Sequence, residues 1–117
     1  MSLTAEHIAT FCLSLPGARD DIKWRGVRVF SVAESKMFAL MHLNGLNTLA
    51  FKVDDDLFLG LCDRPGIRPA PYLARARWIS MAAPYPLSDS ELQELLMRSH
   101  QLVVAKLPKR LKLALLR

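Results

Sequence analysis

The chain has 117 residues, of which 51% are hydrophobic and 23% are charged, with 5 glycines and 2 cysteines. This composition excludes an intrinsically disordered chain, a collagen-like repeat and a disulfide-rich scaffold, and the length predicts one globular domain over residues 1–117. The net charge of +5 is uneven, because residues 1–63 hold 6 basic and 8 acidic side chains whereas residues 64–117 hold 10 basic and 3 acidic ones. Such a basic half is typical of either a solvated surface or a face that binds a polyanion.

The first predicted element is an amphipathic helix of about three turns. Thr4 is a suitable N-cap, and Pro16 with Gly17 stops the helix. Its apolar face is formed by residues at helical spacing, which are Ile8, Phe11, Cys12 and Leu15. The polar residues 18–26 that follow predict a loop.

Three antiparallel strands come next and are expected to form a meander. They are predicted at residues 27–32, 37–43 and 48–53. A short polar turn separates the first two strands. Asn44 and Gly45, the preferred pair for a type I′ hairpin turn, separate the second strand from the third.

Asp54, Asp55 and Asp56 form an acidic triplet directly before an apolar run. Carboxylates suit a helix N-terminus, where free N–H groups and the positive end of the helix dipole favour negative charge. A metal site is the alternative, but consecutive side chains diverge in direction and no His or Glu follows nearby to complete a coordination sphere. We therefore predict a helix that begins at this triplet, and no metal site.

The proline-rich segment 63–72 predicts a turn-rich connection, and residues 77–81 predict a further strand. Alternation along that strand places Trp78 and Ser80 on one face of the sheet and the residues between and after them on the other. A fourth strand would extend the predicted meander.

The clearest helix start lies at Ser88, with Glu91 three residues later to complete a capping box. Apolar side chains at helical spacing continue to Val103. The small polar Ser99 stands in the middle of this stripe, where it must bond the backbone or allow a close approach. Pro108 ends this helix or begins a short, basic C-terminal helix.

The sequence contains no recognisable catalytic motif. The three histidines, His7, His42 and His100, stand far apart and in no metal-ligand spacing. Glycine patterns of phosphate-binding or dinucleotide-binding loops and the nucleophile elbow are also missing from the sequence. We therefore expect a non-enzymatic protein with no catalytic residue, no cofactor and no metal.

The two cysteines, Cys12 and Cys62, lie in apolar neighbourhoods without a CxxC spacing. This favours buried, reduced thiols over a disulfide. No stretch approaches the ~18 apolar residues that a membrane span needs, and the N-terminus lacks the basic leader of a signal peptide. We expect a monomeric, cytoplasmic protein with no membrane partner.

Two basic clusters stand out in the second half of the chain. The first contains Tyr72, Arg75, Arg77 and Trp78, and in an extended segment its two arginines would project to the same face. The second follows the last acidic residue and contains Lys106, Lys109, Arg110, Lys112 and Arg117. Basic side chains bind phosphates and aromatic rings stack on bases. The structural alternatives are a buried Trp78 and basic helix ends that stabilise the helix dipole.

Six segments of the chain, in order, resemble the MmcQ/YjbR family of small bacterial proteins. These segments are LSLPGA (13–18), KMFAL (36–40), FKVD (51–54), PGI (65–67), YLARARW (72–78) and RSHQLVVAKLPK (98–109). The resemblance implies an α+β domain with a CyaY-like fold, in which an antiparallel sheet packs against N- and C-terminal helices. It also implies DNA binding by the double-wing arrangement proposed for that family.

The leading hypothesis is a DNA-binding domain that contacts phosphates through its basic half. Its site residues, most of them at the family's basic and aromatic positions, are Lys52, Arg75, Arg77, Trp78, Lys106, Lys109 and Arg110. The alternative is a small protein-interaction or ligand-binding domain with a cleft near Trp24, Trp78 and Ser99. A contiguous basic surface would favour the first hypothesis, and an apolar cleft with dispersed charge would favour the second.

Overall fold

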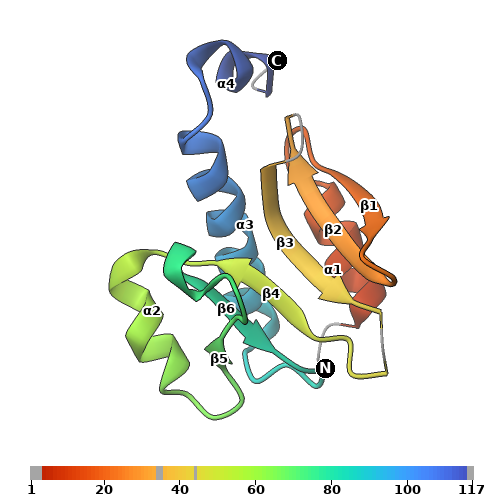
Figure 1. Ribbon diagram of the computed structural model, residues 1–117, viewed down its shortest axis with the longest axis vertical. Coiled ribbons are helices and arrows are strands. Elements are labelled where there is room, and N and C mark those ends of the chain that lie inside the picture. The colour runs from red at the N-terminus through yellow and green to blue at the C-terminus, as the bar shows by residue number, and fades with distance from the viewer. Residues whose placement is uncertain (1–3, 34–35, 44, 116–117) are drawn as a thin grey trace.

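A computed structural model describes residues 4–33, 36–43 and 45–115 of the chain, and the fold is α+β as expected (Figure 1). The elements are, in order, α1 (Ala5–Leu13), β1 (Arg19–Lys23), β2 (Val27–Val32), β3 (Lys36–His42), β4 (Leu49–Lys52), α2 (Asp55–Cys62), β5 (Arg68–Pro69), the 3₁₀ helix η1 (Ala74–Ala76), β6 (Trp78–Met81), α3 (Asp89–Ala105) and α4 (Lys109–Leu115). Within the described ranges, no helix is both long and apolar enough to cross a membrane.

The strands form one sheet in the order β1-β2-β3-β4-β6-β5, and every neighbouring pair is antiparallel. The predicted meander is confirmed as β2, β3 and β4, and the predicted fourth strand as β6. The expected hairpin turn includes Asn44, which lies outside the described residues. Because β6 pairs with β4, the sheet continues past the meander and brings the C-terminal half of the chain beside it.

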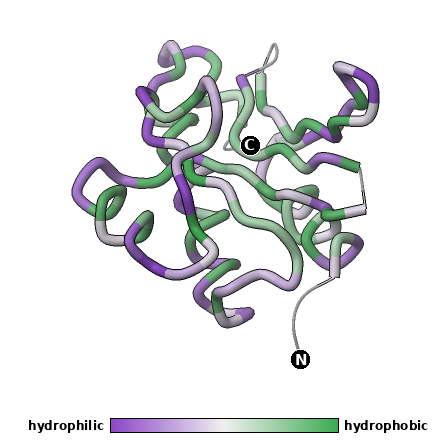
Figure 2. Tube along the Cα trace, turned by 60° about the horizontal axis from the view of Figure 1, so that its bottom comes forward, coloured by the Kyte–Doolittle hydropathy of each residue, from purple (hydrophilic) through white to green (hydrophobic). Residues whose placement is uncertain are grey.

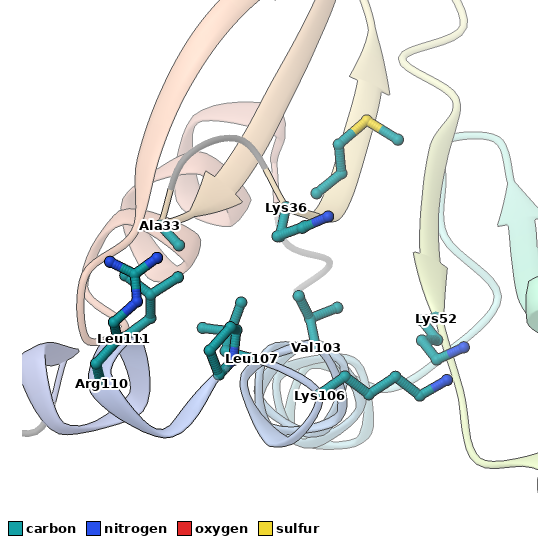
Figure 3. Close-up of a pocket in the computed structure, with 10 residues that line it drawn as sticks. Ala33, Lys36, Lys52, Val103, Lys106, Leu107, Arg110 and Leu111 are labelled. Atoms are coloured by element: carbon teal, nitrogen blue, oxygen red, sulfur yellow. The ribbon is translucent and has the colours of Figure 1, made fainter.

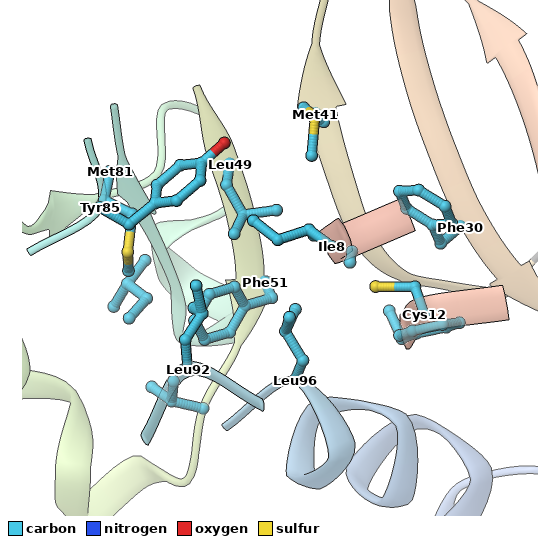
Figure 4. Close-up of a cluster of buried hydrophobic side chains, with 14 of the residues drawn as sticks. Ile8, Cys12, Phe30, Met41, Leu49, Phe51, Met81, Tyr85, Leu92 and Leu96 are labelled. Atoms are coloured by element: carbon cyan, nitrogen blue, oxygen red, sulfur yellow. The ribbon is translucent and has the colours of Figure 1, made fainter. Parts of the chain in front are cut away.

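Helices cover one face of the sheet, which we call the helix face. Helices α1 and α3 pack on this face and lie behind the strands in Figure 1. The core between them contains strand residues such as Phe51 and Met81 together with Leu92 and Leu96 of α3 (Figure 4). This burial of one side of each strand against two helices is the main source of stability for the fold.

The opposite side, the open face, carries a smaller apolar cluster. Its buried members are Val27, Val29, Leu40, Ala50, Ala70 and Trp78. Trp78 and Ser80 lie on this face while Ile79 and Met81 point to the helix face, so the predicted alternation is confirmed. Hydrophobic residues gather along the strands inside the molecule, and hydrophilic ones lie on the turns at its periphery (Figure 2).

Two backbone predictions are wrong. Residues 19–23 form the edge strand β1 and not a loop; all but Lys23 are exposed, so backbone pairing to β2 holds the strand without an alternating apolar pattern. Arg75 lies in a 3₁₀ turn and Arg77 is left-handed (φ 63°), so their side chains do not share the face of an extended segment. The connection 63–72 is rich in turns as predicted and also contains the two-residue strand β5.

Helix starts agree with the sequence, but their side chains have different partners. The Thr4 hydroxyl accepts the His7 N–H, and the Ser88 hydroxyl accepts the Glu91 N–H at 3.2 Å. The Glu91 carboxylate does not return to the cap as predicted, because Arg64 binds it in two hydrogen bonds of 2.8 and 3.1 Å. A charged bidentate pair is stronger than a carboxylate–amide contact.

Ser99 attaches α3 to two strands on the helix face. Its hydroxyl accepts the Lys52 backbone N–H at 3.0 Å and donates to the Phe38 carbonyl at 2.5 Å. The side chain is fully buried, so both bonds are made away from water. The small polar residue in an apolar helix stripe therefore allows the close approach that the sequence suggested and also bonds the backbone.

The two cysteines are free thiols. Cys12 is buried as expected, and burial raises the pKa of its thiol to about 12. Cys62 is only partly buried, which corrects the prediction that both are buried, because the C-terminal end of α2 lies at the edge of the core.

Candidate nucleic-acid interface

A hollow of about 500 Å³ lies where the first residue of β3, the last residue of β4, the end of α3 and the start of α4 meet. Four of its lining side chains are basic, and we call it the basic groove: Lys36, Lys52, Lys106 and Arg110. Val103, Leu107 and Leu111 supply apolar walls. The groove is thus a concave surface with cations around hydrocarbon.

Each cation comes from a different element, and the local sequence explains its position. Lys36 opens β3 and Lys52 closes β4, so antiparallel pairing brings both to the same end of the sheet. Lys106 is the C-cap of α3, and Arg110 lies in the first turn of α4, which begins directly after Pro108. In Figure 3 the side chains of Lys106 and Lys52 extend toward each other, while Lys36 and Arg110 come from other walls.

Among the described residues, the positive charge of the groove is not neutralised by ion pairs. None of the four cations forms an ion pair with a carboxylate in the part of the chain that the structure describes. Burial, and then the charges of Lys106 and Arg77, lower the pKa of Lys52 despite the opposing effect of Asp55. The Lys52 ammonium donates one hydrogen bond, to the Ala76 carbonyl at 2.5 Å. An anion in the groove would relieve this mutual repulsion.

The structure brings three of the predicted DNA-binding residues into the groove, namely Lys52, Lys106 and Arg110. Lys109 is exposed on α4 beside it but does not line it, and Arg75 is exposed on η1. These two remain accessible to an extended polyanion.

The other two predicted residues have different environments. The Arg77 guanidinium lies 3.4 Å from an Asp55 oxygen and 5.5 Å from the centre of the Phe58 ring, so it is partly neutralised. Trp78 is 4% exposed and belongs to the open-face cluster, so its ring is not available to stack on a base. The interpretation of Trp78 as a buried residue is the one that the structure confirms.

The alternative cleft is not formed by the residues predicted for it. Ser99 is buried on the helix face and has both hydrogen bonds satisfied, whereas Trp78 is buried on the open face. Trp24 is exposed at the turn between β1 and β2. The sheet itself separates Ser99 from the two tryptophans, because Ser99 belongs to a helix that covers only one face.

Lys36 is the groove residue that sequence reasoning missed. From the sequence alone, it was assigned to the polar turn between the first two predicted strands. The strand register of the predicted meander could have identified it. Ala39 pairs with Phe51, which places the start of β3 and the end of β4 at the same edge. Counting back from that pair brings Lys36 near Lys52.

The acidic triplet has partners of its own. The Asp54 carboxylate accepts two hydrogen bonds of 3.0 Å from Arg98, so it does not bond the helix N-terminus that it precedes. Asp55 contacts Arg77. Across the described ranges, no three His, Cys, Asp or Glu side chains come together in a way that could hold a metal ion.

An antiparallel sheet with helices on one face defines a small α+β domain, and bacterial proteins of known structure share this fold. The chain belongs to the YjbR family, since the family model described as YjbR matches residues 13–102. No curated protein matches the chain.

Two solved proteins share the fold. The crystal structure of Deinococcus radiodurans DR2400, a DUF419-domain protein, has 25% sequence identity and a TM-score of 0.86, covering 96% of this chain and 87% of its own. A Pseudomonas syringae protein, target PsR293, has a crystal structure with 23% identity and a TM-score of 0.72, covering 86% of this chain and 99% of its own. Its solution NMR structure has 22% identity and a TM-score of 0.69, with 86% and 93% coverage.

Proposed function

We propose that this YjbR-family protein is a non-enzymatic DNA-binding domain that holds the phosphate backbone in the basic groove. The observation that carries the proposal is the convergence of Lys36, Lys52, Lys106 and Arg110 on one concave surface without an ion-paired carboxylate among the described residues. Unpaired cations in a groove bind a polyanion by releasing the counterions condensed on it. Lys109 and Arg75 extend the positive surface beyond the groove.

The repulsion among the groove cations supports the same proposal. Burial, and next to it the charge of Lys106, lower the pKa of Lys52, so the free protein keeps like charges close together at some expense in stability. Phosphate oxygens are acceptors that both ammonium groups can share. Bound phosphate should therefore raise the pKa of Lys52 toward its ordinary value of 10.5.

Fluorescence anisotropy with a labelled duplex of about 20 base pairs tests the proposal. If all four groove cations contact phosphates, the logarithm of the binding constant should fall with the logarithm of salt concentration at a slope of about −3.6. The double substitution Lys106→Glu with Arg110→Glu changes exposed side chains on α3 and α4. It should reduce the slope by at least half and weaken binding at low salt by about a hundredfold or more.

Lys23→Glu combined with Arg25→Glu is the matched control, because it reverses two basic side chains as the groove variant does. Lys23 pairs with Val27, which in turn pairs with His42 at the far end of β3 from Lys36, so the control places the same charge change away from the groove. It should weaken binding far less than the groove variant. Equal losses in both variants, or no binding of the wild-type protein at about 50 mM salt, would overturn the proposal.

A further inference from the structure

A second hollow, of about 390 Å³, lies on the open face of the sheet. Its lining is mostly apolar, with Val27, Leu40 and Ala50 contributed by three neighbouring strands. Ligand-binding pockets typically measure about 300–1,000 Å³, so the hollow has room for a heterocyclic ring. Nothing in the groove proposal uses this surface, which we call the ring hollow.

Two exposed aromatic side chains line the ring hollow. Trp24 is 64% exposed and Tyr72 is fully exposed, so neither ring is stabilised by burial in the core. Both residues have left-handed backbone conformations, with φ of 46° and 68°. Bulky side chains rarely adopt this region, and such strain is found preferentially at binding sites. The chain therefore holds two large rings at the surface, beside an apolar hollow, in conformations that are unfavourable locally.

Ser80 supplies a polar group inside the same hollow. Its side chain is 2% exposed, and its hydroxyl has no hydrogen-bond partner among the residues that the structure describes. No side-chain nitrogen or oxygen atom that is fully enclosed in the described part of the chain lacks a partner, so the Ser80 hydroxyl is open to the hollow that it lines. A ligand in the hollow can therefore bond it directly. His42 also lines the hollow, which thus offers ring faces at its rim and the hydrogen-bonding groups of Ser80 and His42. This is an arrangement that recognises a flat heterocycle with a polar edge.

The ring hollow adjoins the basic groove. Met37 lines both. Ala50 in the hollow and Lys52 in the groove are two residues apart on β4, which places them about 7 Å apart on the same face of the strand. A base in the hollow and a phosphate at Lys52 can therefore belong to the same or adjacent nucleotides.

We propose that the ring hollow takes an unpaired base of a single-stranded segment, stacked on Trp24 and Tyr72, while the neighbouring phosphates lie in the basic groove. The inference rests on the proposed function and names the form of nucleic acid that the site selects. Aromatic platforms beside a cationic track are the usual means of binding single strands. A base in a duplex is already stacked and paired, so it cannot enter the hollow.

Two labelled probes of equal phosphate number test the inference by fluorescence anisotropy. One is a single-stranded oligothymidylate of about twelve nucleotides, and the other is an abasic strand of the same length. We expect the thymidylate to bind about tenfold more tightly than the abasic strand, because only it carries bases to stack. Trp24→Ala and Tyr72→Ala should each remove most of that difference without weakening the abasic strand. Leu59→Ala, which removes an exposed apolar side chain from α2, is the control and should change neither probe.

Tryptophan fluorescence provides a second readout, which is measured on the wild-type protein. Stacking of a base on the exposed Trp24 should quench the emission of the wild-type protein, whereas the abasic strand should not, and Trp24→Ala should abolish the quenching while Trp78 continues to emit. The inference is overturned if thymidylate binds no better than the abasic strand and causes no quenching. The groove proposal stands in that case if the Lys106→Glu and Arg110→Glu variant still binds both probes more weakly than the wild-type protein does. Failure of the wild-type protein to bind any probe would overturn both.

Discussion

Two buried serines lie on opposite faces of the same sheet, and their hydroxyls are in opposite states. Ser99, on the helix face, joins α3 to two strands with two hydrogen bonds. Ser80, on the open face, has no partner for its hydroxyl within the described ranges and lines an apolar hollow. The two residues are almost equally buried, but the Ser99 hydroxyl is enclosed and bonded within the protein, whereas the Ser80 hydroxyl is open to the hollow. On the helix face the serine serves cohesion, and on the open face it is available to an outside partner.

The largest loss of stability is expected for Ser99→Ala. The substitution leaves the Lys52 N–H and the Phe38 carbonyl without their partner in the interior, and each unsatisfied group costs about 1–3 kcal/mol. We expect a loss of about 3 kcal/mol in the free energy of unfolding, measured by urea denaturation. Ser90→Ala, at an exposed position in the first turn of the same helix, should change stability by no more than about 0.5 kcal/mol. A loss in Ser99→Ala as small as that of Ser90→Ala would show that water replaces the bonds.

Ser80→Ala should either raise the free energy of unfolding or leave it unchanged. No protein hydrogen bond among the described residues is lost, and a methyl group suits the apolar surroundings better than an unpaired hydroxyl. We expect the free energy of unfolding to stay unchanged or to rise by up to about 1 kcal/mol in the same denaturation experiment, while base-dependent binding of thymidylate weakens. A clear loss of stability would mean that Ser80 has a partner inside the protein, and the contrast between the two faces would then disappear.

The contrast also explains how much the sequence could predict. Strands β2, β3, β4 and β6 were recognised because each is a short, mostly apolar run bounded by turn residues, and the starts of α1 and α3 because Thr4 and Ser88 are local caps. Strand β1 was missed because it lies at the sheet edge, where all but Lys23 are exposed and only backbone pairing defines it. Local sequence patterns predict elements whose side chains are buried, and they predict poorly an edge strand that is stabilised by backbone pairing on one side.

Site residues were harder to predict, because their partners are distant in sequence. The role of Ser99 depends on the carbonyl of Phe38, 61 positions earlier, although its unusual place in an apolar stripe was visible. Glu91 fits a capping box, yet Arg64, 27 positions earlier, takes its carboxylate. Lys36 joins the basic groove only once α3 and α4 are placed against the sheet. In each case the residue type was readable and the tertiary contact was not.

A loss of stability smaller than that of Ser99→Ala is expected for substitution of Arg98, which joins α3 to the start of α2 at the surface, one position before Ser99. Hydrogen bonds from Arg98 hold the pKa of Asp54 below its ordinary value of 3.8, against a smaller opposing effect of desolvation. The pKa of Asp54 is lower in the folded protein than in the unfolded chain. The pair therefore stabilises the fold fully above pH 3.8, and this contribution is lost as the pH falls through the pKa of the folded state.

Arg98→Gln should therefore lower the free energy of unfolding at neutral pH by less than Ser99→Ala does, since nearly half of the Arg98 side chain is exposed and water screens the pair. Urea denaturation of variant and wild type should show this difference shrinking to nothing once the pH is well below 3.8. Arg68→Gln, at an exposed residue of β5, is the matched control and should show no such pH dependence. A difference that persists in acid would mean that Arg98 stabilises α3 by packing of its hydrocarbon stem. The contrast between the buried hydrogen bonds of Ser99 and the exposed ion pair of Arg98 would then not hold.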